Sequence, residues 1–142
     1  VRGETIAPPY HDVKVIDPNK LATFTKTLQD YRAGTIAEKD LPDFRQVYLE
    51  AGMRDMGFMV KEGLTGAQIL MNACAQCHNS KLQQDISRAK FDVDLTKMSR
   101  EEKDKAIARI KLPVDDVKLM PPVRIRSLTP EEIETLTEEL KK

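Results

Sequence analysis

The stretch Cys74-Ala75-Gln76-Cys77-His78 holds both cysteines of the chain and one of its two histidines. A C-x-x-C-H run is the pattern of covalent haem attachment. On a helical turn, the two thiols can each add to one vinyl group of the porphyrin, and the next residue projects its imidazole toward the iron. The run therefore predicts one haem c, bound through Cys74 and Cys77, with His78 as an axial ligand of the iron.

Two other kinds of site use closely spaced cysteines. A dithiol redox site normally lies in a βαβ unit with a helix starting at its first cysteine, whereas here the cysteines fall at the end of a predicted helix. A zinc site needs four ligands, and His11 is the only histidine outside the motif. His11 stands in a proline-rich stretch typical of exposed residues, so haem is favoured over both alternatives.

Length and composition are those of an ordinary folded domain. The chain has 142 residues, of which 40% are hydrophobic and 32% charged, and its 23 basic residues balance 23 acidic ones. No apolar run approaches the roughly 20 residues that cross a bilayer. We therefore expect no direct membrane span and no nucleic-acid partner. Because the chain begins at Val1 without a leader pattern, we expect that a targeting peptide was removed or the sequence trimmed.

The first 62 residues predict an N-terminal arm followed by a helical extension. Residues 1–16 show no sustained period and are interpreted as an extended arm. Asp17 and Pro18 are a helix N-cap and first-turn proline, and Gly34 can end that helix. Its apolar stripe comprises Leu21, Phe24, Leu28 and Tyr31. A second helix is expected from near Asp40 and Pro42, with one apolar face comprising Phe44, Val47, Tyr48 and Ala51.

Residues 63–142 predict three helices that start at capping boxes. Thr65, Ser99 and Thr129 are each followed three residues later by Gln or Glu. The first helix carries Cys74 and runs into His78. The second has its inward face at Ala106, Ile107 and Ile110 and stops before Pro113, and the third has it at Ile133, Leu136 and Leu140. Residues 79–98 and 112–127 are expected to be loops, the latter because of its prolines.

No stretch alternates convincingly enough for a strand, so the predicted class is all-α. Residues 63–142 also resemble a small class I cytochrome c domain. Gly66 stands where that family has a small residue that lets the last helix cross closely, Cys74–His78 follows, and Leu119-Met120-Pro121-Pro122 precedes a terminal helix. The resemblance implies a monohaem cytochrome c domain at 63–142, with 1–62 as an extension. It also implies that Met120 is the second axial ligand.

The chain departs from the family in two places. The family often has a Gly-Pro-containing loop soon after the histidine, whereas Asn79–Gln84 contains neither residue, so the group that orients His78 is not identified. The family also tends to place an aromatic residue in its last helix, where this chain has aliphatic ones.

Five other methionines compete with Met120 for the iron, namely Met53, Met56, Met59, Met71 and Met98. Met71 lies too near His78 to reach the opposite face of the ring, and Met98 directly precedes a capping box. The remaining three form a stripe that is more typical of packing than of copper binding. Arg124 and Arg126 follow the methionine loop, and they are interpreted either as partners of a haem propionate or as a solvated pair.

Ligation by Met120 would fill both axial positions and raise the potential, which favours electron transfer over substrate chemistry. No acid, base or nucleophile cluster is evident, so we do not expect an enzyme. The expected role is a soluble carrier or a cytochrome subunit of a respiratory complex. Its partners would be redox proteins, including subunits of a membrane complex docked through residues 1–62. Two other roles stay open for this extension, namely wrapping the haem domain and covering part of the haem edge. Covalent haem implies a periplasmic or periplasm-facing location. The alternative is a haem-based ligand-binding or sensor protein with an open or labile sixth position.

Overall fold

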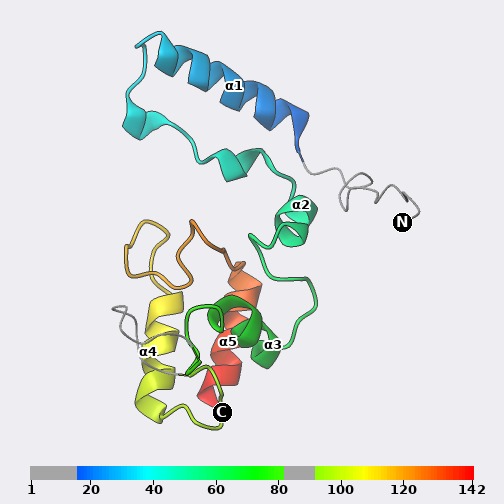
Figure 1. Ribbon diagram of the computed structural model, residues 1–142, viewed down its shortest axis with the longest axis vertical. Helices are drawn as coiled ribbons and strands as arrows, with labels where there is room; N and C mark the ends of the chain where they lie inside the picture. The colour runs from blue at the N-terminus through cyan, green and yellow to red at the C-terminus, as the bar shows by residue number, and fades with distance from the viewer. Residues whose placement is uncertain (1–15, 82–91) are drawn as a thin grey trace, which may run out of the picture. The chain divides into compact units, whose positions relative to one another are not determined.

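The computed structural model describes residues 16–81 and 92–142 (Figure 1). Within these residues the chain forms helices and turns with no strand, which confirms the all-α class. The chain divides after Met56 into two compact units. None of the described helices combines the length and the apolar character that a bilayer crossing requires. The predicted N-terminal arm with His11, and much of the loop after His78, lie outside the described residues.

The first unit begins with helix α1, Pro18–Arg32, as predicted. The side chain of Asp17 caps it, because Oδ1 accepts hydrogen bonds from the backbone N–H groups of Asn19 and Lys20 at 2.9 and 3.2 Å. Gly34 follows with a φ of +73°, a left-handed conformation that glycine adopts without steric cost.

The apolar stripe of α1 has little cover within its own unit. The helix contains no buried residue, and Leu21, Leu28 and Tyr31 are exposed. It packs against the 3₁₀ helix η2, Phe44–Val47, whose Val47 is the one buried apolar side chain among the described residues of this unit. The helix is therefore held by its cap and a thin contact rather than by a core.

The predicted second helix is wrong. In its place lie η1, Glu38–Asp40, then η2, then a short α2, Glu50–Asp55. Leu41 is extended because it precedes Pro42. Tyr48 is extended because it forms a β-bridge with Ile16, next to which the N–H of Asp17 donates to the carbonyl of Val47 at 2.8 Å. The apolar period of the side chains predicts one helix here, but these long-range backbone contacts interrupt it.

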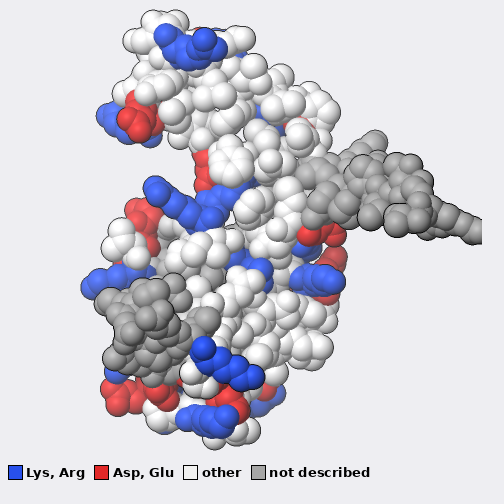
Figure 2. Space-filling model, viewed as in Figure 1, with Lys and Arg blue, Asp and Glu red and all other residues white. Residues whose placement is uncertain are grey.

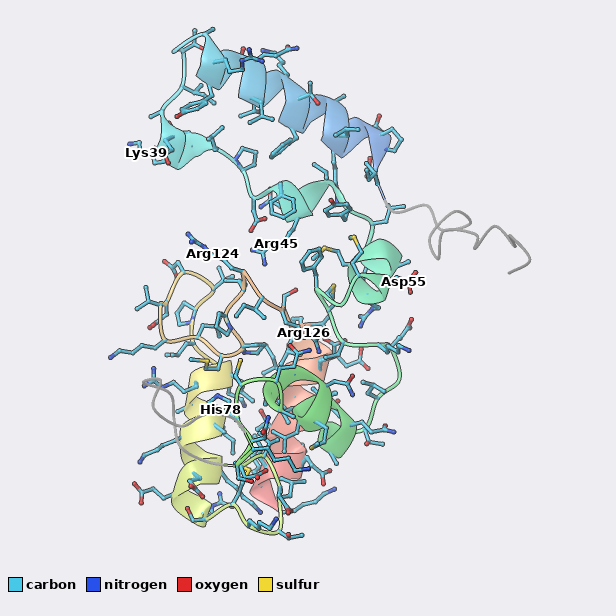
Figure 3. The ribbon with its side chains drawn as sticks, in the orientation of Figure 1. Lys39, Arg45, Asp55, His78, Arg124 and Arg126 are labelled. Carbon is cyan, nitrogen blue, oxygen red and sulfur yellow. The ribbon has the colours of Figure 1, made fainter. Side chains whose placement is uncertain are left out.

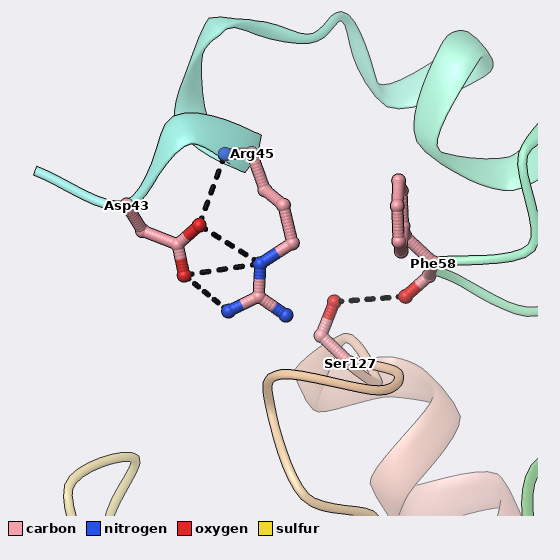
Figure 4. Close-up of polar contacts among 4 residues, drawn as sticks. All are labelled: Asp43, Arg45, Phe58 and Ser127. Atoms are coloured by element: carbon pink, nitrogen blue, oxygen red, sulfur yellow. Dashed lines mark hydrogen bonds and ion pairs between the residues drawn. The ribbon is translucent and has the colours of Figure 1, made fainter.

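The start of η2 is set by one carboxylate. Asp43 Oδ1 accepts from both the backbone N–H and Nε of Arg45, at 2.9 Å each, and the guanidinium forms an ion pair with the same carboxylate (Figure 4). The hydrogen bond to Asp43 raises the pKa of Arg45. The contact between Arg45 and Asp43 therefore stabilises the local structure at the start of η2.

The second unit contains α3, Gly66–Cys74, α4, Arg100–Ile110, and α5, Pro130–Lys141. Each starts at its predicted capping box, with both reciprocal hydrogen bonds formed. α5 packs against both α3 and α4 (Figure 1). The buried apolar core of this unit comprises Val60, Ile69, Leu70, Val93, Met98, Ile110, Leu136 and Leu140. The inward faces predicted for α4 and α5 are confirmed.

Gly66 allows α3 and α5 to cross closely. A Cβ atom at this position would lie 2.4 Å from the Cβ of Glu139 and 2.8 Å from the backbone carbonyl oxygen of Thr135. Real Cβ atoms do not approach other atoms so closely, so no other residue fits here without movement of α5. The crossing carries the C-terminal end of α3, and with it Cys74, into contact with the core.

Charged groups of both signs are interspersed over the visible face of the second unit (Figure 2). Along α4, Arg100 pairs with Asp104 and Lys105 pairs with Glu101, at 2.9 and 2.7 Å. Such exposed pairs stabilise a helix only slightly. This side of α4 is thus an ordinary polar surface.

Candidate functional site

One turn of chain brings Cys74, Cys77 and His78 together. Cys74 is the last residue of α3, and its carbonyl accepts hydrogen bonds from the N–H groups of Cys77 and His78, at 3.0 and 2.9 Å. Both thiols are free and half-buried. The cysteines fall at a helix end, as predicted, but α3 stops at Cys74 and does not run into His78, because residues 75–77 form a turn that places the imidazole on the residue closing it.

The Cys74 thiol packs against the hydrophobic core of the second unit. Burial raises the pKa of Cys74 to about 11; the nearby Cys77 adds to the rise, and the positive charge of Arg126 opposes it. At neutral pH this thiol keeps its proton.

The backbone at His78 is tied to a later segment of the chain. The N–H of Val93, a core residue, donates to the carbonyl of His78 at 3.2 Å. Two residues beyond the histidine, Ser80 donates to Oδ2 of Asp92 through its N–H at 3.1 Å and its hydroxyl at 2.7 Å. No pattern in the sequence indicated this connection.

Met120 lies in the loop between α4 and α5, as predicted. Its N–H donates to the carbonyl of Arg109 at 3.3 Å, and Arg109 Nη1 donates back to the carbonyl of Lys118 at 3.4 Å. The side chain is 36% exposed. The loop thus returns to the end of α4 and holds the methionine's backbone there.

The rival methionines of the second unit lie elsewhere. Met98 is buried in the core, and Met71 is exposed on α3. Met59 is half-buried beside the β-bridge to Ser127. Of the methionines described in this unit, Met120 alone lies in the loop between α4 and α5.

The two arginines that follow the loop differ in their surroundings. Nε of Arg126 donates to the carbonyl of Gly57 at 3.0 Å, and its Nη1 donates to the carbonyl of Asn72 in α3. Arg124 is exposed and lies well apart from His78 (Figure 3). Arg126 is therefore a bridge between three backbone segments beside the cysteines, and the structure does not bring Arg124 to them.

A shallow pocket of about 390 Å³ lies on the outer side of α3. It is lined by Met71, Asn72, Ala75, Gln76 and Arg126. Two of these residues, Ala75 and Gln76, stand between the two cysteines of the C-x-x-C-H run.

The loop between α4 and α5 leaves apolar side chains in solvent. Val114, Val117 and Ile125 are more than half exposed, Val117 almost completely at 95%. An apolar loop of this kind normally has something to cover, because exposed aliphatic groups lose the stabilisation of burial. The candidate ligand Met120 lies among them.

The chemistry of these groups fits a covalently bound haem. Two free thiols and an imidazole share one turn, and a thioether stands on a separate loop. Among residues 16–81 and 92–142, no three His, Cys, Asp or Glu side chains converge as a metal site. Comparisons with protein-family models, curated proteins and solved structures found no match to this chain.

Proposed function

We propose that this chain is a cytochrome c-like electron-transfer protein that binds one haem c covalently through Cys74 and Cys77. His78 and Met120 would be the axial ligands. The observation that carries the proposal is the shared acceptor: the carbonyl of Cys74 holds the N–H groups of both Cys77 and His78. This places two thiols and an imidazole within one turn at the end of a packed helix.

A bound haem supplies a reversible one-electron couple. The chain's residues would anchor, orient and shield that group. Cys74 and Cys77 would hold the ring, His78 and Met120 would ligate the iron, and a thioether ligand would favour the reduced state. With both axial positions filled, no substrate binds the metal, which is why we propose a carrier and not an enzyme.

The exposed apolar residues of the loop between α4 and α5 support Met120 as the second ligand. Val114, Val117 and Ile125 gain burial if the loop closes over a large apolar ring. The close crossing at Gly66 supports a cytochrome c-like arrangement of the first and last helices. The extension at 1–62 would then serve to dock redox partners, including subunits of a membrane respiratory complex.

A second candidate function is a haem-based ligand-binding or sensor protein. The observation that favours it is the exposure of the Met120 side chain, whose residue is restrained by a single described backbone bond of 3.3 Å. A weakly held thioether can yield its position to a diatomic gas. Tight, rapid binding of carbon monoxide to the reduced protein would favour this function over the carrier.

The covalent attachment is tested by expressing the chain in a periplasm with a competent maturation system. We expect a coloured protein whose pigment stays with the polypeptide in acidified organic solvent, and a Cys74→Ala/Cys77→Ala variant that loses it. A colourless wild-type protein, or pigment that is extracted, would contradict the proposal.

The second ligand is tested by absorption spectra of the oxidised protein. Met120→Ala should abolish the weak sulfur-to-iron charge-transfer band at the red end of the visible, while Met71→Ala, which removes an exposed methionine from α3, should retain it. Loss of the band in both variants, or in neither, would count against Met120. The location outside the cytoplasm is tested by fractionation of the same cells.

A further inference from the structure

The segment that follows His78 is closed by a short network of hydrogen bonds. Residues 78–81 lie against residues 92–94 through the bonds from Val93 to His78 and from Ser80 to Asp92. The nearer oxygen of Asp92 takes both donors of Ser80, and its other oxygen, Oδ1, accepts from the N–H of Asp94 at 3.2 Å. Oδ2 of this carboxylate thus ties together two separate pieces of chain, while Oδ1 holds the turn within residues 92–94.

This network connects the histidine to the core. Val93 is 2% exposed and packs among the buried residues of the second unit. Its N–H points at the carbonyl of His78, while the N–H of His78 points at the carbonyl of Cys74. Because the peptide groups on both sides of His78 are held, the direction in which its side chain leaves the backbone is set by these bonds.

We propose that Asp92 is a positioning residue for His78. Its hydrogen bonds with Ser80 keep residues 78–81 against Val93, and this fixes the direction of the imidazole. The consequence for an iron ligand rests on the proposed function. The restraint itself belongs to this chain's own residues. It occupies the place where the resembled family uses a Gly-Pro-containing loop, which this chain lacks.

The neighbouring Asp94 offers a matched control. It lies two residues from Asp92 and also accepts hydrogen bonds, from the N–H and hydroxyl of Thr96 at 3.1 and 2.6 Å. It pairs with Lys97 at 2.8 Å. Its contacts stabilise the turn after Val93 and do not include Ser80. Loss of its side chain therefore removes an equal charge and leaves the hydrogen bonds between Asp92 and Ser80 intact.

The experiment compares the full chain with its Asp92→Ala, Asp92→Asn and Asp94→Ala variants, each purified after expression with the maturation system. The first readout is amide hydrogen exchange at Val93. We expect exchange about tenfold faster in Asp92→Ala, a smaller rise in Asp92→Asn, which keeps an oxygen acceptor, and wild-type exchange in Asp94→Ala.

The second readout is the paramagnetic NMR shift pattern of the His78 ring in the oxidised protein, which reports the orientation of the imidazole. It should change in Asp92→Ala, return toward wild type in Asp92→Asn, and stay unchanged in Asp94→Ala. Unchanged Val93 exchange in Asp92→Ala, or equal changes in the two alanine variants, would overturn the proposal. If the wild-type protein lacks covalent haem, the proposed function fails. Amide exchange at Val93 then still decides whether Asp92 holds residues 78–81 in place.

Discussion

At the scale of single residues, Gly66 is tightly constrained by its neighbours. At the start of α3, the Cβ of Glu139 and the carbonyl oxygen of Thr135 in α5 occupy the space that a side chain would need. Helix propensity favours alanine over glycine by up to about 1 kcal/mol, so propensity and packing make opposite predictions for this site.

Gly66→Ala should therefore destabilise the protein, by about 1–3 kcal/mol, because the helices must separate to admit the methyl group. Urea unfolding of the full chain measures this. Met71→Ala, on the exposed side of the same helix, is the control and should change the free energy of unfolding by less than about 0.5 kcal/mol. A more stable Gly66→Ala variant would mean that α3 and α5 do not cross here.

Cys74 makes the stability of the haem-free chain depend on alkaline pH. Its pKa rises from 9.0 to about 11 on folding, so the unfolded chain loses this proton first. Stability from this group is complete below pH 9 and is lost as the pH rises through 11. The loss should amount to at most about 3 kcal/mol.

Unfolding by urea between about pH 8 and pH 11, with the thiols reduced, tests this dependence. Lysines and tyrosines titrate in the same range, so the informative quantity is the difference between the wild-type chain and Cys74→Ala. The variant should lose less stability with rising pH. Equal losses in both chains would show that the thiol is not buried.

At the scale of elements, Arg126 joins three backbone segments of the second unit. It binds the carbonyls of Gly57 and Asn72, and the next residue, Ser127, donates to the carbonyl of Phe58 through its N–H at 2.8 Å and its hydroxyl at 3.4 Å (Figure 4). The exit of the loop between α4 and α5 is thereby fastened to the start of the unit and to α3.

Arg126→Ala should cost about 1–3 kcal/mol of unfolding free energy, because two carbonyls lose a charged donor. Arg124→Ala should be nearly neutral, since that side chain is exposed. Denaturation of the two variants side by side makes the comparison. If both were neutral, the guanidinium of Arg126 would not be holding these segments together.

Elements whose signals are local were predictable from the sequence. The N-cap at Asp17 and the capping boxes at Thr65, Ser99 and Thr129 involve residues two or three apart, and each helix starts where its motif indicates. The C-x-x-C-H turn belongs to the same class, because its hydrogen bonds span three or four residues.

Features that depend on distant residues were not predictable in this way. The apolar period after Asp40 indicated one helix, but pairing of Tyr48 with Ile16 imposes extended backbone there. The hydrogen bond from Ser80 to Asp92 joins residues that no helical or strand period relates. Likewise, no pattern in the sequence indicated that Arg126 binds the carbonyls of Gly57 and Asn72.

At the scale of the whole molecule, the boundary between the two units determines where the chain can be shortened. The second unit starts at Gly57, and Val60 is buried in its core at 1% exposure. A chain that starts at Gly57 keeps all these contacts. One that starts at Gly63 loses Val60, the Gly57 carbonyl bound by Arg126 and the Phe58 carbonyl bound by Ser127.

The chain from Gly57 should therefore keep the haem spectrum and the stability of the second unit. The chain from Gly63 should be less stable by about 2–4 kcal/mol, from the lost core side chain and its partners. Thermal and urea unfolding of both chains checks this. Binding of a redox partner should weaken in both, if the extension docks partners; undiminished binding would assign the extension another role.

The three capping boxes bear on the order of events in biogenesis. Each is complete once four consecutive residues have left the ribosome or the export channel, so the starting points of α3, α4 and α5 do not wait for tertiary contacts. A maturation enzyme would thus meet the C-x-x-C-H segment after a helix start that its own sequence encodes. A helix of nine residues is stabilised by packing against α5, so the two sulfurs would be held in register only once that packing forms.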